Sequence, residues 1–105
     1  MDLRASIMAA TKQAMKDKAV NRLSTLRLIS AAFKDRDIAA RAEGNDDGVG
    51  NDELLAILGK MTRQRSESAK TYEEAGRIDL VERELEEITV IEEFLPRQLD
   101  GRAHV

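Results

Sequence analysis

Apolar residues recur at steps of three and four along most of the chain, a spacing that places them on one face of an α-helix. The first stripe predicts a helix from Leu3 to about Lys18, with Asp2 as its N-cap. The second predicts a helix from Val20 to about Glu43, whose wide apolar arc suits contacts with more than one neighbour. The stripes comprise Leu3, Ile7, Ala10 and Ala14, and then Leu23, Leu26, Leu28, Ile29, Phe33 and Ile38.

A third helix is predicted after the segment 43–50, whose three glycines and several turn-forming residues indicate a mobile surface connection. Asn51 or Asp52 is expected to cap this helix at its N-terminus. It is expected to reach about Ala75, because Gly76 is well placed to adopt the left-handed conformation that ends a helix.

A fourth helix is predicted to begin with Asp79 as its cap and to end near Phe94, ahead of Pro96, the lone proline. Four helices with short connections predict an all-α, four-helix bundle. The predicted bundle occupies residues 1–96, and residues 97–105 are expected to form a loose tail. The apolar face of the fourth helix comprises Leu80, Val81, Leu85, Ile88, Ile91 and Leu95.

The composition narrows the chemistry that the chain performs. It has no cysteine, which excludes disulfides and thiolate zinc ligands and favours a reducing, cytoplasmic location. The single histidine, His104, lies in the predicted tail, so neither a catalytic triad nor a histidine-based metal site is expected. No apolar run approaches the roughly 20 residues that span a bilayer. We therefore expect no catalytic residue, metal, cofactor or membrane contact.

One charged residue lies within the apolar stripe of the third helix. Arg65 is near the centre of that stripe, where an unpaired guanidinium is costly to bury. The preferred interpretation is an ion pair with Glu84, which lies in the apolar arc of the fourth helix. The alternative is a polar ligand pocket formed by Arg65, Ser68, Tyr72 and Glu84.

The net charge of −3 conceals an uneven distribution. Residues 1–42 hold nine Lys or Arg and four Asp or Glu, whereas residues 73–93 hold nine acids and two arginines. The basic half either attracts the acidic helix within the bundle, which is preferred, or faces a polyanion. For the second alternative, the candidate contacts on the predicted second and third helices are Arg22, Arg27, Lys34, Lys60, Arg63 and Arg65.

Several short segments form an ordered set. They are RLSTLR at 22–27 and AAFK at 31–34; Lys60, RQR at 63–65, Ser68, Tyr72, EAGR at 74–77 and DL at 79–80; and Glu84 with IEEFLP at 91–96. This set resembles YqeY-like proteins of the GatB/YqeY family over about residues 1–100. The resemblance implies a four-helix N-terminal bundle, followed by a smaller helical domain akin to the tail of the GatB subunit of tRNA-dependent amidotransferases.

The resemblance also carries functional expectations. Those amidotransferases convert misacylated Glu-tRNA or Asp-tRNA to its amide with glutamine as nitrogen donor, and the GatB tail is linked to tRNA engagement. Only nine residues follow Pro96, so we expect this chain either to be truncated or to work with its bundle alone. The expected function is a non-catalytic adaptor that binds tRNA or a protein of that pathway. The alternatives are a component of a glutamine-dependent carbon-nitrogen ligase and a general protein-interaction module.

Overall fold

The computed structural model describes residues 2–96, which form four helices and no strand. The all-α bundle predicted from the sequence is confirmed, whereas the predicted tail at 97–105 lies outside the described residues. No described helix is both long enough and apolar enough to span a bilayer. The helices are α1 at Leu3–Lys16, α2 at Val20–Ala42, α3 at Asn51–Glu74 and α4 at Ile78–Glu92.

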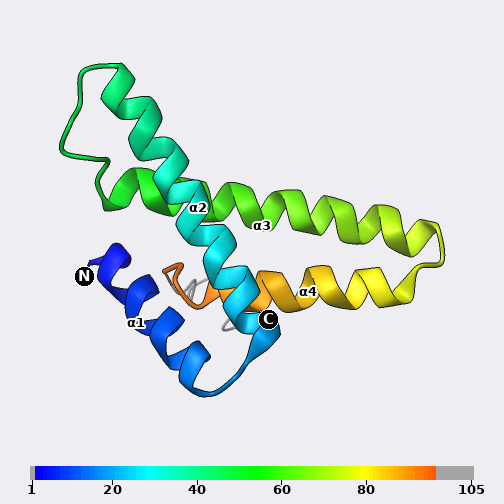
Figure 1. The fold of residues 1–105 in the computed structure, drawn as a ribbon. Helices are drawn as coiled ribbons and strands as arrows, with labels where there is room; N and C mark the ends of the chain where they lie inside the picture. Colours follow the sequence, from blue (N-terminus) through cyan, green and yellow to red (C-terminus); the bar gives the residue numbers. More distant parts are fainter. Residues whose placement is uncertain (1, 97–105) are drawn as a thin grey trace.

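The helices pair along the sequence and then pack across it. The α3 and α4 helices run side by side in opposite directions, and α1 packs against α2 (Figure 1). The α2 helix crosses the α3–α4 pair and contacts both of its members. The connected ends of α3 and α4 project beyond α1 and α2 (Figure 1). The projecting part therefore has fewer neighbours against which to bury apolar surface.

The core forms where α2 crosses the α3–α4 pair, and α1 closes one side of it with Leu3 and Ile7. The apolar arc of α2 serves several neighbours, as predicted, although Leu28 and Ile38 stay exposed. The prediction that Leu85 belongs to the core-facing stripe is wrong, because Leu85 stays exposed. The α2 helix packs on the side of α4 that carries Arg83 and Val90, and helical geometry places Leu85 on another side. The side chains with the least solvent exposure are Leu26, Ile29, Leu54, Leu58 and Ile91.

Two predictions about helix ends are confirmed. Asp2 caps α1, because its side chain accepts hydrogen bonds from the backbone N–H groups of Arg4 and Ala5. Gly76 has a φ of 74° directly after α3, in the left-handed region where glycine avoids the strain of a Cβ atom.

The N-caps predicted for α3 and α4 are wrong. The α3 helix is capped at Gly50 and α4 at Arg77, and neither residue makes a side-chain capping bond. Asn51, one of the predicted caps, is instead the first residue of α3, and the acids suggested as caps, Asp52 and Asp79, lie within the first turns. Their negative charge still favours the helix there, since it lies beside the positive end of the helix dipole.

A guanidinium ties three segments together at the start of the fold. Arg4 donates to both carboxylate oxygens of Asp37, at 2.7 and 2.8 Å, and to the carbonyl oxygen of Val49 at 2.9 Å. The backbone N–H of Val49 donates to the same carboxylate at 3.1 Å. Bonding to Arg4, and then to Val49, holds the pKa of Asp37 below its usual range. The segment 43–50 is thus anchored at its end through buried Val49, which its composition did not indicate.

Candidate functional site

The six candidate contact residues fall into two groups in the structure. Arg22 and Arg65 are used within the fold, since each forms an ion pair with a glutamate of α4 or its C-cap. The remaining four side chains are exposed and make no hydrogen bond or ion pair with another residue in the range 2–96. These outward cations are Arg27 and Lys34 on α2, and Lys60 and Arg63 on α3.

Arg22 joins the start of α2 to the end of α4. Its Nη1 and Nη2 atoms donate to the two carboxylate oxygens of Glu93, at 2.6 and 2.8 Å. This parallel arrangement is the strong form of an arginine–carboxylate contact. It also brings together two segments that carry the family resemblance, 22–27 and 91–96. Arg22 therefore contributes to docking α2 onto α4.

Arg65 lies between α3 and α4, as its place in the apolar stripe predicted, but the predicted partner is wrong. Its Nε donates to Glu87 at 2.8 Å, not to Glu84, and its Nη1 donates to the carbonyl oxygen of Met61 at 3.2 Å. The side chains of Arg65 and Glu87 are only 16% and 19% exposed. Helical periodicity places each residue on the correct face, but it does not set the register between two antiparallel helices.

Glu84 is left as a partly buried carboxylate without a hydrogen bond or ion pair to any residue in 2–96. Burial raises its pKa above the ordinary value, because the charged form loses hydration, and the nearby charge of Glu87 adds to the rise. The charges of Arg65 and Arg83 lower the pKa of Glu84 but do not outweigh these effects. The ionised form of Glu84 is therefore less favourable in the folded chain than in the unfolded one.

Glu84→Gln is expected to raise the free energy of unfolding at about pH 7, because it removes a carboxylate whose ionisation opposes folding. A raised folded-state pKa means that this penalty disappears when the pH falls below the unfolded-state value, about 4.3 for glutamate. The difference between wild type and variant should therefore shrink toward about pH 4. Urea unfolding at both pH values measures it, and a constant difference would contradict the assigned pKa direction.

The predicted polar pocket is present only in part. Ser68 and Tyr72 line a shallow depression of about 480 Å³ on α3, together with Gln64, Glu67 and Thr71. Arg65 and Glu84 are not among its lining residues. The structure therefore separates the hydroxyl groups of Ser68 and Tyr72 from the charged pair with which the sequence grouped them.

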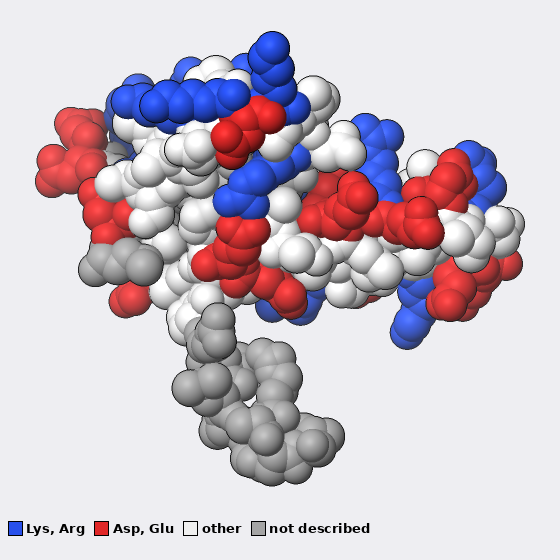
Figure 2. Space-filling view, turned by 90° about the horizontal axis from the view of Figure 1, so that it is seen from below, with Lys and Arg blue, Asp and Glu red and all other residues white. Residues whose placement is uncertain are grey.

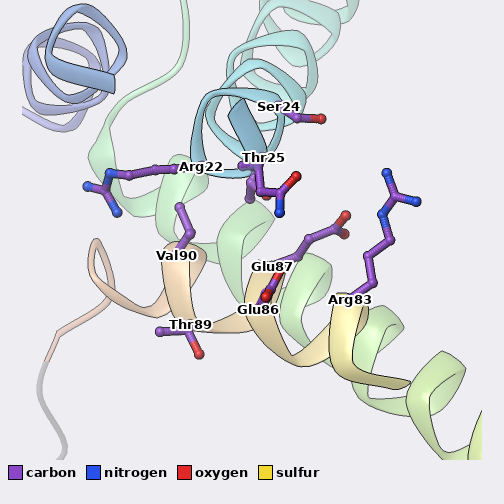
Figure 3. A pocket seen from close by; sticks show the side chains of 9 residues that line it. Arg22, Ser24, Thr25, Arg83, Glu86, Glu87, Thr89 and Val90 are labelled. Atoms are coloured by element: carbon purple, nitrogen blue, oxygen red, sulfur yellow. The ribbon is translucent and has the colours of Figure 1, made fainter. Parts of the chain in front are cut away.

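A second cleft, about 300 Å³ in volume, was not anticipated from the sequence. It lies between the first turns of α2 and the side of α4 that faces them, with Arg22 and Arg83 toward opposite ends (Figure 3). Thr25 and Val90 lie between them, and Glu86 and Glu87 supply acidic groups (Figure 3). The cleft thus carries both charge signs. Periodicity did not reveal it, because the packing of α2 on α4 creates it.

The surface charge follows the uneven distribution in the sequence. In the view of Figure 2, Lys and Arg side chains gather along the upper edge, whereas Asp and Glu side chains lie across the middle and the projecting part carries both signs. Within residues 2–96, no group of three or more His, Asp or Glu side chains is arranged to hold a metal ion. The features that stand out chemically are therefore cationic side chains and clefts between helices.

Comparison with known proteins identifies the class to which this small all-α module belongs. The Yqey-like protein family matches residues 4–103, and the chain belongs to that family. A relative in Clavispora lusitaniae, the mitochondrial protein called altered inheritance of mitochondria protein 41, is 32% identical over 93 residues. The match covers 89% of this chain and 51% of that protein, so this chain spans about half the length of its relative.

Proposed function

We propose that this YqeY-like chain is a non-catalytic helical adaptor that binds tRNA through its phosphates. The observation that carries the proposal is that the outward cations, Arg27, Lys34, Lys60 and Arg63, have no carboxylate partner among residues 2–96. Five other arginines, Arg4, Arg22, Arg36, Arg65 and Arg77, are paired within the fold. An unpaired exposed cation binds a phosphate without first giving up an intramolecular contact.

The placement of the outward cations suits a backbone contact rather than base recognition. Arg27 and Lys34 lie seven residues apart on α2, which separates them by about 10.5 Å along the helix axis. Lys60 and Arg63 lie one turn apart on α3, which α2 contacts. The chain has two Phe, one Tyr and no Trp, so it offers little surface on which bases stack. We infer binding by charge and shape, with weak sequence preference.

Neutralising one outward cation on each helix tests the proposal. Lys34→Gln and Lys60→Gln should each weaken tRNA binding and lower the slope of log K against log salt concentration by about one. The measurement is fluorescence anisotropy of labelled tRNA over a series of salt concentrations. Lys16→Gln, an exposed lysine on α1, is the matched control and should change neither quantity beyond a small uniform effect. Binding that is insensitive to salt would contradict a phosphate contact.

The other candidate functions make different predictions for the same protein. Recovery from cells of one stable protein partner that survives ribonuclease treatment would favour a protein-interaction module. Glutamine-dependent amidation of misacylated tRNA by the purified chain alone would contradict the non-catalytic part of the proposal.

The cytoplasm is the proposed location, although the name of the relative from C. lusitaniae describes that protein as mitochondrial. Imaging of the tagged chain distinguishes these two locations.

A further inference from the structure

A groove of about 460 Å³ runs between α1 and α2. Buried Ile7 and Phe33 form part of its lining. Met8 and Met15, which are 60% and 49% exposed, line it further along α1, with Lys12 between them in the sequence. We call Met8, Lys12 and Met15 the methionine row. Methionine is flexible and polarisable, so a row of this kind adapts readily to an apolar partner.

The charge around this groove is positive. Lys12 and Lys34 are exposed lining residues without an ion pair to any residue in 2–96. Among the described residues that line it, the one acid is Asp37, which is already bound by Arg4. The α1 helix as a whole carries three basic residues and no acidic one. The groove therefore suits an apolar surface that is flanked by negative charge.

The outer face of α4 has the complementary character. Ile78 and Leu85 lie seven residues apart and are 56% and 50% exposed, so neither is covered within the fold. Exposed Glu82 lies between them on the same face, and we call these three residues the acidic row. The α4 helix carries six acidic residues against one basic residue, Arg83. A helix with an exposed apolar pair and this charge is the kind of partner that the groove fits.

The two rows have the same internal spacing. In each of them the charged residue follows the first apolar residue by four positions and precedes the second by three. Helices that pack in parallel or antiparallel orientation through these rows place the two apolar pairs against each other and bring Lys12 close to Glu82. We propose that the α1–α2 groove of one copy binds α4 of a second copy, so that the chain self-associates through its methionine and acidic rows.

The size of the two rows sets the expected strength of this contact. Each row contributes two apolar side chains and one charge. These side chains bury far less area than the roughly 800 Å² per partner of a stable interface. The association is therefore weak and becomes measurable only at high protein concentration. The surfaces that meet are different, so each copy presents one groove and one α4 helix to others. The contact uses neither Arg27, Lys60 nor Arg63, but Lys34 belongs both to the groove lining and to the outward cations, so the association is measured without RNA.

Sedimentation equilibrium of the full chain, over a wide range of concentration and without RNA, measures this association. Lys12→Glu and Glu82→Lys should each weaken it at least about tenfold, since each variant places like charges opposite one another. An equimolar mixture of the two variants should restore association. In the mixture, the reversed charge in the groove of one variant faces the reversed charge on α4 of the other, and these two charges are again opposite. Restoration distinguishes a direct contact from an indirect effect on folding.

Lys70→Glu is the matched control, because it reverses an exposed lysine on α3 outside both rows and should leave association unchanged. Circular dichroism establishes that each variant keeps its helices. A chain that stays monomeric at every concentration would overturn the proposal, as would association that survives Lys12→Glu. Failure of the mixed variants to associate would also overturn it.

Discussion

Ile91→Ala is expected to lower the free energy of unfolding by about 2–5 kcal/mol. Ile91 is the one fully buried residue of α4, with an exposed fraction of 0%. It belongs to the core cluster that α2, α3 and α1 also supply. The substitution removes its packing contacts and leaves a cavity in the core to which all four helices contribute side chains. Urea unfolding followed by circular dichroism measures the loss.

The matched control for this prediction lies in the same helix. Leu85→Ala also removes large apolar atoms, but Leu85 is 50% exposed, so its removal leaves no closed cavity. We expect a loss below about 1 kcal/mol, partly offset because alanine has the higher helix propensity. The comparison is made at low protein concentration, where self-association does not contribute. Equal losses of unfolding free energy for the two variants would contradict the assignment of Ile91 to the core.

The contrast between Ile91 and Leu85 shows what periodicity predicts and what it omits. Both residues belong to the apolar stripe of α4 that the sequence predicts, and the stripe correctly indicates a helix. Burial depends in addition on whether a third helix covers that stripe. The α2 helix packs on the side of α4 that carries Arg83, Glu86 and Val90, and helical geometry places Leu85 on another side, where no third helix covers it. The crossing of helices is a long-range arrangement, and a local pattern of residues does not encode it.

The same limit explains the ion pairs. The sequence shows that Arg65 occupies a core-facing stripe and therefore needs a partner, and the structure confirms that need. It does not distinguish Glu84 from Glu87, because the choice depends on how far α3 slides along α4. The bonds from Arg4 to Asp37 and Val49 are harder still to anticipate, since they join residues 33 and 45 positions apart. Family resemblance adds the fold but no partner for any side chain.

Internal pairing also refines the proposed tRNA contact. Six cations were candidates from the sequence, and an arginine in a strong bidentate pair, such as Arg22, binds a phosphate only by leaving its carboxylate. The cations that lack such partners are the better candidates for a phosphate contact. The interface suggested by the structure is therefore smaller than the one suggested by the sequence. It should show a correspondingly shallower dependence on salt.

Arg65→Met is expected to lower the free energy of unfolding by about 1–3 kcal/mol. Removing one member of a fully buried ion pair costs about 3–5 kcal/mol, because it leaves the other charge without compensation. The pair of Arg65 and Glu87 retains some exposure, at 16% and 19%, so water reduces that cost. Urea unfolding measures the change. The tRNA affinity of the folded variant should stay close to that of wild type, because Arg65 is already engaged.

The double variant Arg65→Met with Glu87→Leu shows whether the loss comes from a stranded carboxylate. Replacing both charges by apolar groups of similar size should recover most of the stability, since neither charge then has to be desolvated. Glu87→Leu alone leaves the Arg65 guanidinium without its carboxylate and should be less stable than the double variant. A fully stable Arg65→Met protein that has lost tRNA binding would reverse the assignment. Arg65 would then be a contact residue and not a link between α3 and α4.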